Sequence, residues 1–139
     1  MQSLPTVLLR HTTRIGSHYD WLLANPRDPM GLLWTARCDL SSSHWLRAGR
    51  FMLQAIQPHR RVYLNYQGAI SGGRGSVLRV DEGDFVPRLW TPRRMMLDVK
   101  LIHCQAEVEL KRVATDRWQA RVRSVEREAP EPRAVDAAV

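Results

Sequence analysis

Residues 102–111 read Ile-His-Cys-Gln-Ala-Glu-Val-Glu-Leu-Lys, an unbroken alternation of apolar and polar side chains. Because successive side chains of a β-strand point to opposite faces, this pattern predicts a strand with one buried and one solvent-exposed face. Residues 118–123 alternate in the same way, and Thr115-Asp116-Arg117 can form the turn between the two segments. We therefore predict a C-terminal antiparallel hairpin whose first strand buries Ile102, Cys104, Ala106, Val108 and Leu110.

Further short strands are predicted upstream of this hairpin, each bounded by residues typical of turns. Prolines and Asx residues at 25–29 separate two of them, and Pro58 ends another because it has no N–H to donate to a ladder. The serines at 41–43 suit a loop or one helical turn, and a glycine-rich loop occupies 71–75. The predicted strands are residues 6–10, 17–23, 32–37, 51–56 and 76–80.

The number and spacing of these segments predict the fold class. About eight short strands without a helix of more than about two turns are typical of small antiparallel barrels and sandwiches. We expect a mostly β protein, a small closed antiparallel β-barrel of about eight strands with one or two short helices. The 139 residues leave room for one domain, placed at 1–126, and a disordered tail at 127–139. Side chains fill a barrel of this size, so a site is expected on a rim or open face.

The charge balance indicates a polyanionic partner. Lysine and arginine number 21 against 14 acidic residues, a net charge of +7, and only Lys100 and Lys111 are lysines. The planar guanidinium of arginine binds phosphate through two nitrogens, so nucleic acid is the expected partner. The alternative is a codon bias that replaces lysine by arginine throughout.

The expected cellular compartment follows from three features that the sequence does not show: a membrane-spanning segment, a secretory signal and a disulfide scaffold. No apolar run approaches the roughly 18 residues needed to span a bilayer, and residues 1–10 do not resemble a secretory signal. Cys38 and Cys104 are too few for a disulfide scaffold, and we expect both to be small core residues. We expect a cytoplasmic monomer that does not bind membranes.

A candidate metal site lies in the second predicted strand. His18 and Asp20 are two residues apart, so their side chains share one face of that strand. His11 ends the preceding strand, and an antiparallel pairing would place it beside His18. Two imidazoles and a carboxylate suit Mn²⁺, Zn²⁺, Fe²⁺ or Co²⁺ with coordination positions left open. The alternative is that these histidines are half-buried packing residues, which is the more common role of histidine in a strand.

A second cluster follows Pro58. His59 and Tyr63 are accompanied by Arg60 and Arg61, a set that can hold a phosphate and move a proton. His18, Asp20 and His59 would also form the facial triad of an Fe²⁺ oxygenase, which is a separate hypothesis. Such enzymes usually have a larger barrel than this chain can form.

Several motifs follow one another in a characteristic order. These are His11, His18-Tyr19-Asp20, Leu33-Trp34-Thr35-Ala36, His59 to Tyr63, Tyr66-Gln67-Gly68-Ala69-Ile70 and Gly73 to Gly75. Their order resembles the 3′-phosphoesterase domain of bacterial and archaeal DNA ligase D proteins, over roughly residues 7–123.

The resemblance implies an activity and a set of roles. Members of that family fold as a small β-barrel, bind Mn²⁺, and remove a terminal ribonucleotide or phosphate from DNA 3′ ends. By this resemblance, His11, His18 and Asp20 would bind Mn²⁺, with Zn²⁺ or Co²⁺ as alternatives, and His59 and Tyr63 would contact the scissile phosphate. The expected partners are DNA 3′ ends and the ligase or polymerase proteins of end joining.

One position departs from the family pattern. The family strand continues His-Tyr-Asp-x-Arg, and this chain has Leu22 in place of that arginine. We expect Leu22 to lie on the face of the site. Two functions therefore stay open, an active 3′-phosphoesterase and a catalytically weak or inactive relative that binds DNA ends or a repair partner.

Other arginines are candidates to replace the missing guanidinium. Arg50, which leads into the strand before His59, most resembles a second phosphate-binding arginine of the family and is the predicted catalytic arginine. The residues predicted to bind phosphate or nucleic acid are Arg37, Arg60, Arg61 and Arg74.

Overall fold

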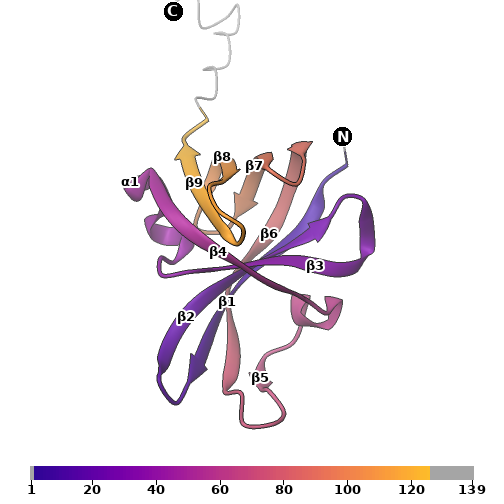
Figure 1. Ribbon diagram of the computed structural model, residues 1–139, viewed down its shortest axis with the longest axis vertical. Helices are drawn as coiled ribbons and strands as arrows, with labels where there is room; N and C mark the ends of the chain where they lie inside the picture. Colours follow the sequence, from indigo (N-terminus) through magenta and orange to yellow (C-terminus); the bar gives the residue numbers. More distant parts are fainter. Residues whose placement is uncertain (1, 126–139) are drawn as a thin grey trace, which may run out of the picture.

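The computed structural model describes residues 2–125, which form one antiparallel sheet with short helical segments (Figure 1). Eight strands close into a barrel in the order β1-β2-β3-β4-β9-β8-β7-β6, and β6 pairs back with β1. β5 is a two-residue strand that pairs with the beginning of β6. The predicted fold class, a small closed antiparallel β-barrel of about eight strands, is confirmed. The predicted tail at 127–139 lies outside the described residues.

The strands differ widely in length, and β6 is the longest with 15 residues. The helical segments are a 3-10 turn at Ser42–His44, the short helix α1 at Trp45–Ala48, and a second 3-10 turn at Arg61–Leu64. The strands are β1 Leu4–Thr13, β2 Gly16–Asn25, β3 Asp28–Cys38, β4 Arg50–His59, β5 Gly68–Ala69, β6 Ser76–Trp90, β7 Arg94–Leu101, β8 Gln105–Arg112 and β9 Arg117–Arg123.

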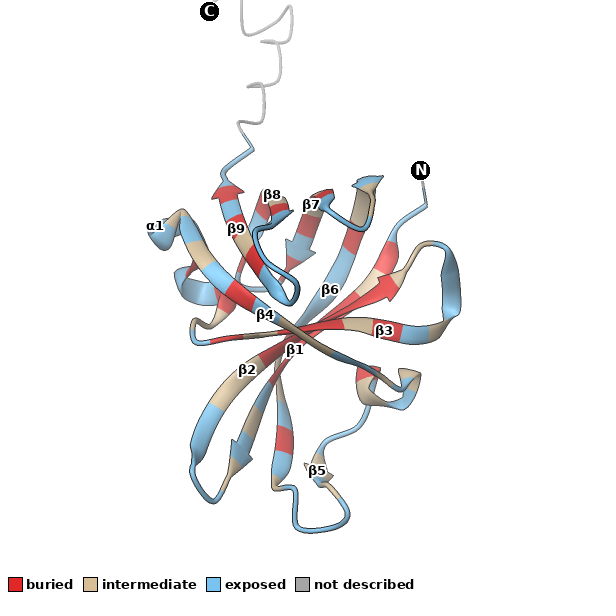
Figure 2. Ribbon diagram, in the orientation of Figure 1, coloured by how far each residue is buried: buried red, intermediate tan, exposed pale blue. Residues whose placement is uncertain are grey.

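Strands β1, β2 and β3 have buried residues on both faces. One face lines the barrel interior, and the other is on the outside of the barrel. Trp34 of β3 packs edge-to-face on Trp118 of β9, with ring centroids 5.5 Å apart, so its face points into the barrel. Trp21 of β2 shares that face and packs against Trp45 of α1. The opposite face of β1, β2 and β3 points out of the barrel, where Leu64 of the second 3-10 turn is buried. Figure 2 shows buried residues where these strands cross, while the hairpin tips are exposed.

The C-terminal hairpin is confirmed, with one error at its start. Strands β8 and β9 pair with Val108 opposite Val122 and Leu110 opposite Ala120, all of them buried. Cys104 and Ala106 are buried as predicted, whereas Ile102 is 65% exposed. The ladder ends at Leu101, whose N–H donates to the Cys104 carbonyl, so Ile102 lies in the turn between β7 and β8. Alternation predicts the buried face only where the strand itself continues.

Two strands extend beyond their predicted ends. The sequence predicts both ends too early, because residues typical of turns lie inside these strands. β6 continues past the predicted end at residue 80, through Gly83 and Pro87, and pairs with β7, which was not predicted. A Cβ at Gly83 would lie 1.8 Å from the Lys100 carbonyl oxygen, so glycine here permits a close approach of two strands rather than a turn. β4 likewise continues through Pro58 to His59.

The two cysteines are buried free thiols, as predicted for core residues. Burial raises the pKa of Cys38 to about 12 and that of Cys104 to about 11, so both are neutral near pH 7. Among the described residues, no helix has the length and apolar character needed to cross a membrane.

Candidate metal centre

The pairing of β1 with β2 brings the candidate ligands together. His11 and His18 are direct partners in this ladder, and their ring centroids lie 4.9 Å apart. Asp20 is the partner of Leu9 in the same ladder and lies two residues beyond His18, on the same face. The predicted proximity of His11, His18 and Asp20 is therefore confirmed. The group lies on the outer face of β1 and β2, outside the barrel interior.

Asp20 is the most buried member of the group, with 1% of its surface exposed. Its Oδ1 lies 3.2 Å from His18 Nε2 and 3.9 Å from Arg37 Nε. Its Oδ2 lies 3.7 Å from His11 Nδ1 and 3.8 Å from His59 Nε2. Neither carboxylate oxygen has a hydrogen-bond partner, and the same is true of His18 Nε2 and Arg37 Nε. Four nitrogens thus surround a buried carboxylate, and three of them, at 3.7–3.9 Å, lie beyond hydrogen-bond distance.

This arrangement fits a divalent ion. One ligand atom from each of His11, His18 and Asp20 lies within 4.8 Å of the other two. Two ligands bound to one ion at about 2.1 Å and a tetrahedral angle are roughly 3.4 Å apart, which is close to the spacing around Asp20. An ion there would also satisfy both Asp20 oxygens and His18 Nε2, which are buried atoms that are costly to leave without partners. The three side chains are therefore a candidate metal-binding group.

Two backbone carbonyls orient the histidine rings. His11 Nε2 lies 2.8 Å from the Arg74 carbonyl oxygen, and His59 Nδ1 lies 3.0 Å from the Gln57 carbonyl oxygen. A carbonyl only accepts, so each of these nitrogens carries a proton, and the ring nitrogen that faces Asp20 is the one that a metal ion could bind. Metal-binding histidines commonly donate their second nitrogen to a carbonyl in this way. Sequence patterns carry no signal for these contacts, because the partners are backbone groups.

The electrostatic environment favours neutral imidazole at His18. Burial lowers the pKa of His18 below its ordinary value, while the charge of Asp20 acts in the opposite direction. The nearby Arg37 and His11 also lower it. Neutral imidazole is the form that binds a metal, so the site does not have to lose a proton from His18 first.

His59 and Tyr63 line the same pocket as His11 and Asp20 of the candidate metal-binding group. This pocket has a volume of about 600 Å³, and Arg60 and Arg74 line it as well. The rings of His59 and Tyr63 pack edge-to-face with centroids 5.4 Å apart. Because His59 and His18 both approach the Asp20 carboxylate, they lie on the same side of the sheet.

The predicted arginines divide into two groups. Arg37 is the direct ladder partner of Asp20, and its Nε is the guanidinium nitrogen 3.9 Å from that carboxylate. Arg50, the predicted catalytic arginine, opens β4, whereas His59 closes it. A ten-residue strand is about 30 Å long, so Arg50 lies at the opposite end of β4 from His59, and it does not line the pocket. Arg61 donates to the Pro29 carbonyl 2.5 Å away and does not line the pocket.

Leu22 shares the strand face of Asp20, as expected. Its ladder partners Val7 and Thr35 are buried, and Leu22 itself is fully buried. It therefore forms part of the apolar layer beside the site. A guanidinium near Asp20 comes from the neighbouring strand, through Arg37.

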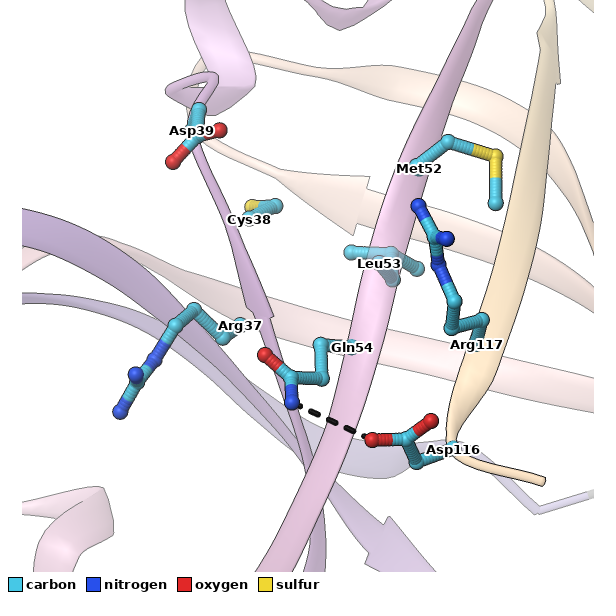
Figure 3. A pocket seen from close by; sticks show the side chains of 8 residues that line it. All are labelled: Arg37, Cys38, Asp39, Met52, Leu53, Gln54, Asp116 and Arg117. Carbon is cyan, nitrogen blue, oxygen red and sulfur yellow. Dashed lines mark hydrogen bonds between the residues drawn. The ribbon is translucent and has the colours of Figure 1, made fainter. Parts of the chain in front are cut away.

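A separate hollow of about 400 Å³ lies between β3, β4 and β9 (Figure 3). Figure 3 shows Gln54 between Arg37 and Asp116, donating to the Asp116 carboxylate 3.2 Å away, while the Arg37 guanidinium points away from Arg117. Two arginines and two aspartates line this hollow, so their charges balance and it offers no net attraction for phosphate. The pocket beside His59, in contrast, is lined by two arginines, Arg60 and Arg74, and one aspartate, Asp20.

Comparisons with known proteins give no family for this chain. No protein-family model matches it, and no curated protein matches it.

Proposed function

We propose that this protein is a divalent-metal-dependent phosphoesterase that acts on the 3′ ends of DNA or RNA–DNA primers, removing a terminal ribonucleotide or phosphate in end repair. The observation that carries the proposal is the buried carboxylate of Asp20, which has no hydrogen-bond partner and is surrounded by the nitrogens of His11, His18 and His59. The order of motifs that resembles the DNA ligase D 3′-phosphoesterase domain supports the same function.

The residues around the pocket have roles that follow from their atoms. His11, His18 and Asp20 would hold the ion, which, when bound, polarises a phosphoryl oxygen and activates water. His59 presents Nε2 into the pocket and can transfer a proton. Tyr63 can donate its hydroxyl to a phosphate oxygen. Arg60 and Arg74 supply positive charge where the phosphate would lie.

Mn²⁺ is the proposed ion. Two imidazoles and one carboxylate form a mixed nitrogen and oxygen ligand set, which Mn²⁺ accepts with positions open for water and substrate. Zn²⁺ and Co²⁺ accept the same set, so the metal is identified by comparing the three ions in the assays below.

One observation favours a second candidate function, a catalytically weak relative that binds DNA ends or a ligase or polymerase partner. Leu22 replaces the arginine that the family places on this face, and it is fully buried. Loss of one donor that stabilises transition-state charge costs about 10² to 10³ in rate. Arg37 approaches Asp20 from β3 and is the residue that would compensate.

The direct test is release of inorganic phosphate from a primer with a 3′-phosphate in the presence of Mn²⁺. We expect activity in the wild type that EDTA abolishes, and its loss in His18→Ala. His103→Ala is the matched control, because His103 is exposed and outside the pocket. Binding of Mn²⁺ and of the primer without turnover would favour the second function. Absence of metal binding would contradict the phosphoesterase, and absence of both metal and primer binding would contradict both functions.

A further inference from the structure

A second hollow continues from the pocket of the metal centre. Its volume is about 370 Å³, and its walls share four residues with that pocket. The shared residues are Arg60, Tyr63, Ile70 and Ser71. Tyr63 is thus a common wall, with one side toward His59 and the other toward Tyr66. A ligand with its phosphate beside His59 would extend directly into this second hollow.

The second hollow is aromatic and apolar. Tyr63 and Tyr66 pack edge-to-face with ring centroids 5.8 Å apart, and Val62 and Ile70 complete the apolar wall. The Arg60 guanidinium lies 6.0 Å from the centroid of the Tyr63 ring. The described residues that line the hollow include no carboxylate. The lining therefore suits a flat π-system whose attached group is anionic.

The backbone holds the Tyr66 side chain in place although this residue is 37% exposed. Its hydroxyl donates to the Ala69 carbonyl, which ties the ring to β5. Gly68 between them has φ = 131°, a conformation that residues with a side chain rarely adopt. A ring held this way loses little conformational entropy when a second ring stacks on it.

We infer that this hollow binds the nucleobase of the nucleotide whose 3′-phosphate occupies the adjoining pocket. This inference rests on the proposed function for the identity of the phosphate, and it names the substrate class as a nucleoside 3′-phosphate. Stacking on an aromatic ring accepts any base, because every base has a π-face. The hollow would therefore recognise the presence of a base rather than a particular sequence.

The test measures binding without turnover, so that it does not depend on catalysis. The metal-free full chain in EDTA is titrated calorimetrically with deoxyadenosine 3′-monophosphate and with its abasic counterpart, 1,2-dideoxyribose 3-phosphate. The wild type should bind the nucleotide more tightly by roughly 5- to 160-fold, the range expected for one stacked base. Tyr66→Leu should remove this preference while leaving the affinity for the abasic phosphate unchanged. Tyr66→Phe keeps the ring but loses the hydrogen bond to Ala69, so it should retain the preference in part.

A short oligonucleotide with the same 3′-terminal nucleotide distinguishes strand ends from free nucleotides, because only the strand end gains affinity from further phosphates. Equal affinity of the wild type for the nucleotide and the abasic phosphate, or no binding of either, would overturn the inference. Release of phosphate in the primer assay would still support the phosphoesterase in that case. Conversely, a base preference without phosphate release would support the hollow and contradict catalysis.

Discussion

Asp20 belongs to the ladder between β1 and β2, and its carboxylate lines the pocket beside His59. The sequence predicted its grouping with His11 and His18, since a spacing of two fixes a shared face and an antiparallel ladder brings the first histidine alongside. It did not predict the carbonyls of Arg74 and Gln57 that orient the rings, because these contacts depend on where the loops lie. Residue identity thus specified the candidate ligands but not their orientation.

Substituting Asp20 should separate metal binding from folding. Asp20→Asn removes a charged ligand, so the rise in melting temperature that Mn²⁺ gives the wild type should disappear. The free energy of unfolding of the metal-free protein should change by less than about 1 kcal/mol, because neither Asp20 oxygen has a hydrogen bond to lose. Thermal melts with Mn²⁺ and with EDTA measure both quantities. An undiminished Mn²⁺ shift in the variant would exclude Asp20 as a ligand.

Substituting Arg37, with Arg50 as the control, tests whether Arg37 replaces the guanidinium that Leu22 lacks. Arg37 Nε lies 3.9 Å from Asp20, whereas Arg50 is at the far end of β4. Arg37→Ala should lower the rate of Mn²⁺-dependent phosphate release by about 10² to 10³. Arg50→Ala should leave the rate within about twofold, as expected for a substitution away from the reacting groups. If Arg50→Ala lowered the rate as much as Arg37→Ala, the assignment of Arg37 would be wrong.

At the scale of elements, β6 shows why part of the fold was not predicted. Its glycine and proline are typical of turns, yet the strand continues through both and pairs with β7. At Gly83 the deciding factor is the close approach of Lys100, a residue distant in sequence. The alternating hairpin of β8 and β9 was predicted because its signal is local. Strand ends that depend on a neighbouring strand carry no such signal.

Asp81 closes the end of the barrel where β6 meets the turn between β7 and β8. Its buried carboxylate accepts hydrogen bonds from the Ser42 hydroxyl and from the backbone N–H groups of Ile102 and His103. Asp81→Ala leaves these donors without their partner and should lower the free energy of unfolding by about 2–4 kcal/mol. Urea denaturation measures this loss. Asp84→Ala, at an exposed position of the same strand, is the control and should change stability by less than about 0.5 kcal/mol.

At the scale of the whole molecule, the net charge of +7 is less informative than its distribution. Several arginines are paired with carboxylates on the outer surface of the barrel, among them Arg88 with Asp98, Arg94 with Glu109 and Arg123 with Glu107. The paired carboxylates partly neutralise the charge of those arginines. Arg60 and Arg74 line the pocket of the metal centre, and Arg37 adjoins it. The sequence predicted a polyanionic partner from the net charge of the whole chain. The structure shows arginines beside the candidate metal site.

The salt dependence of binding distinguishes this local charge from the general excess. A single strand that contacts three arginines should show a slope of about −2 when the logarithm of its association constant is plotted against that of the salt concentration. Arg60→Gln removes one pocket contact and should make the slope shallower by about 0.7. Arg88→Gln lowers the net charge equally but affects an arginine already paired with Asp98, so the slope should stay unchanged. Fluorescence anisotropy of a 3′-phosphorylated oligonucleotide in EDTA gives both slopes. Equal changes in the two variants would mean that the strand responds to the total charge of the protein, and binding would then not be centred on the pocket beside His59.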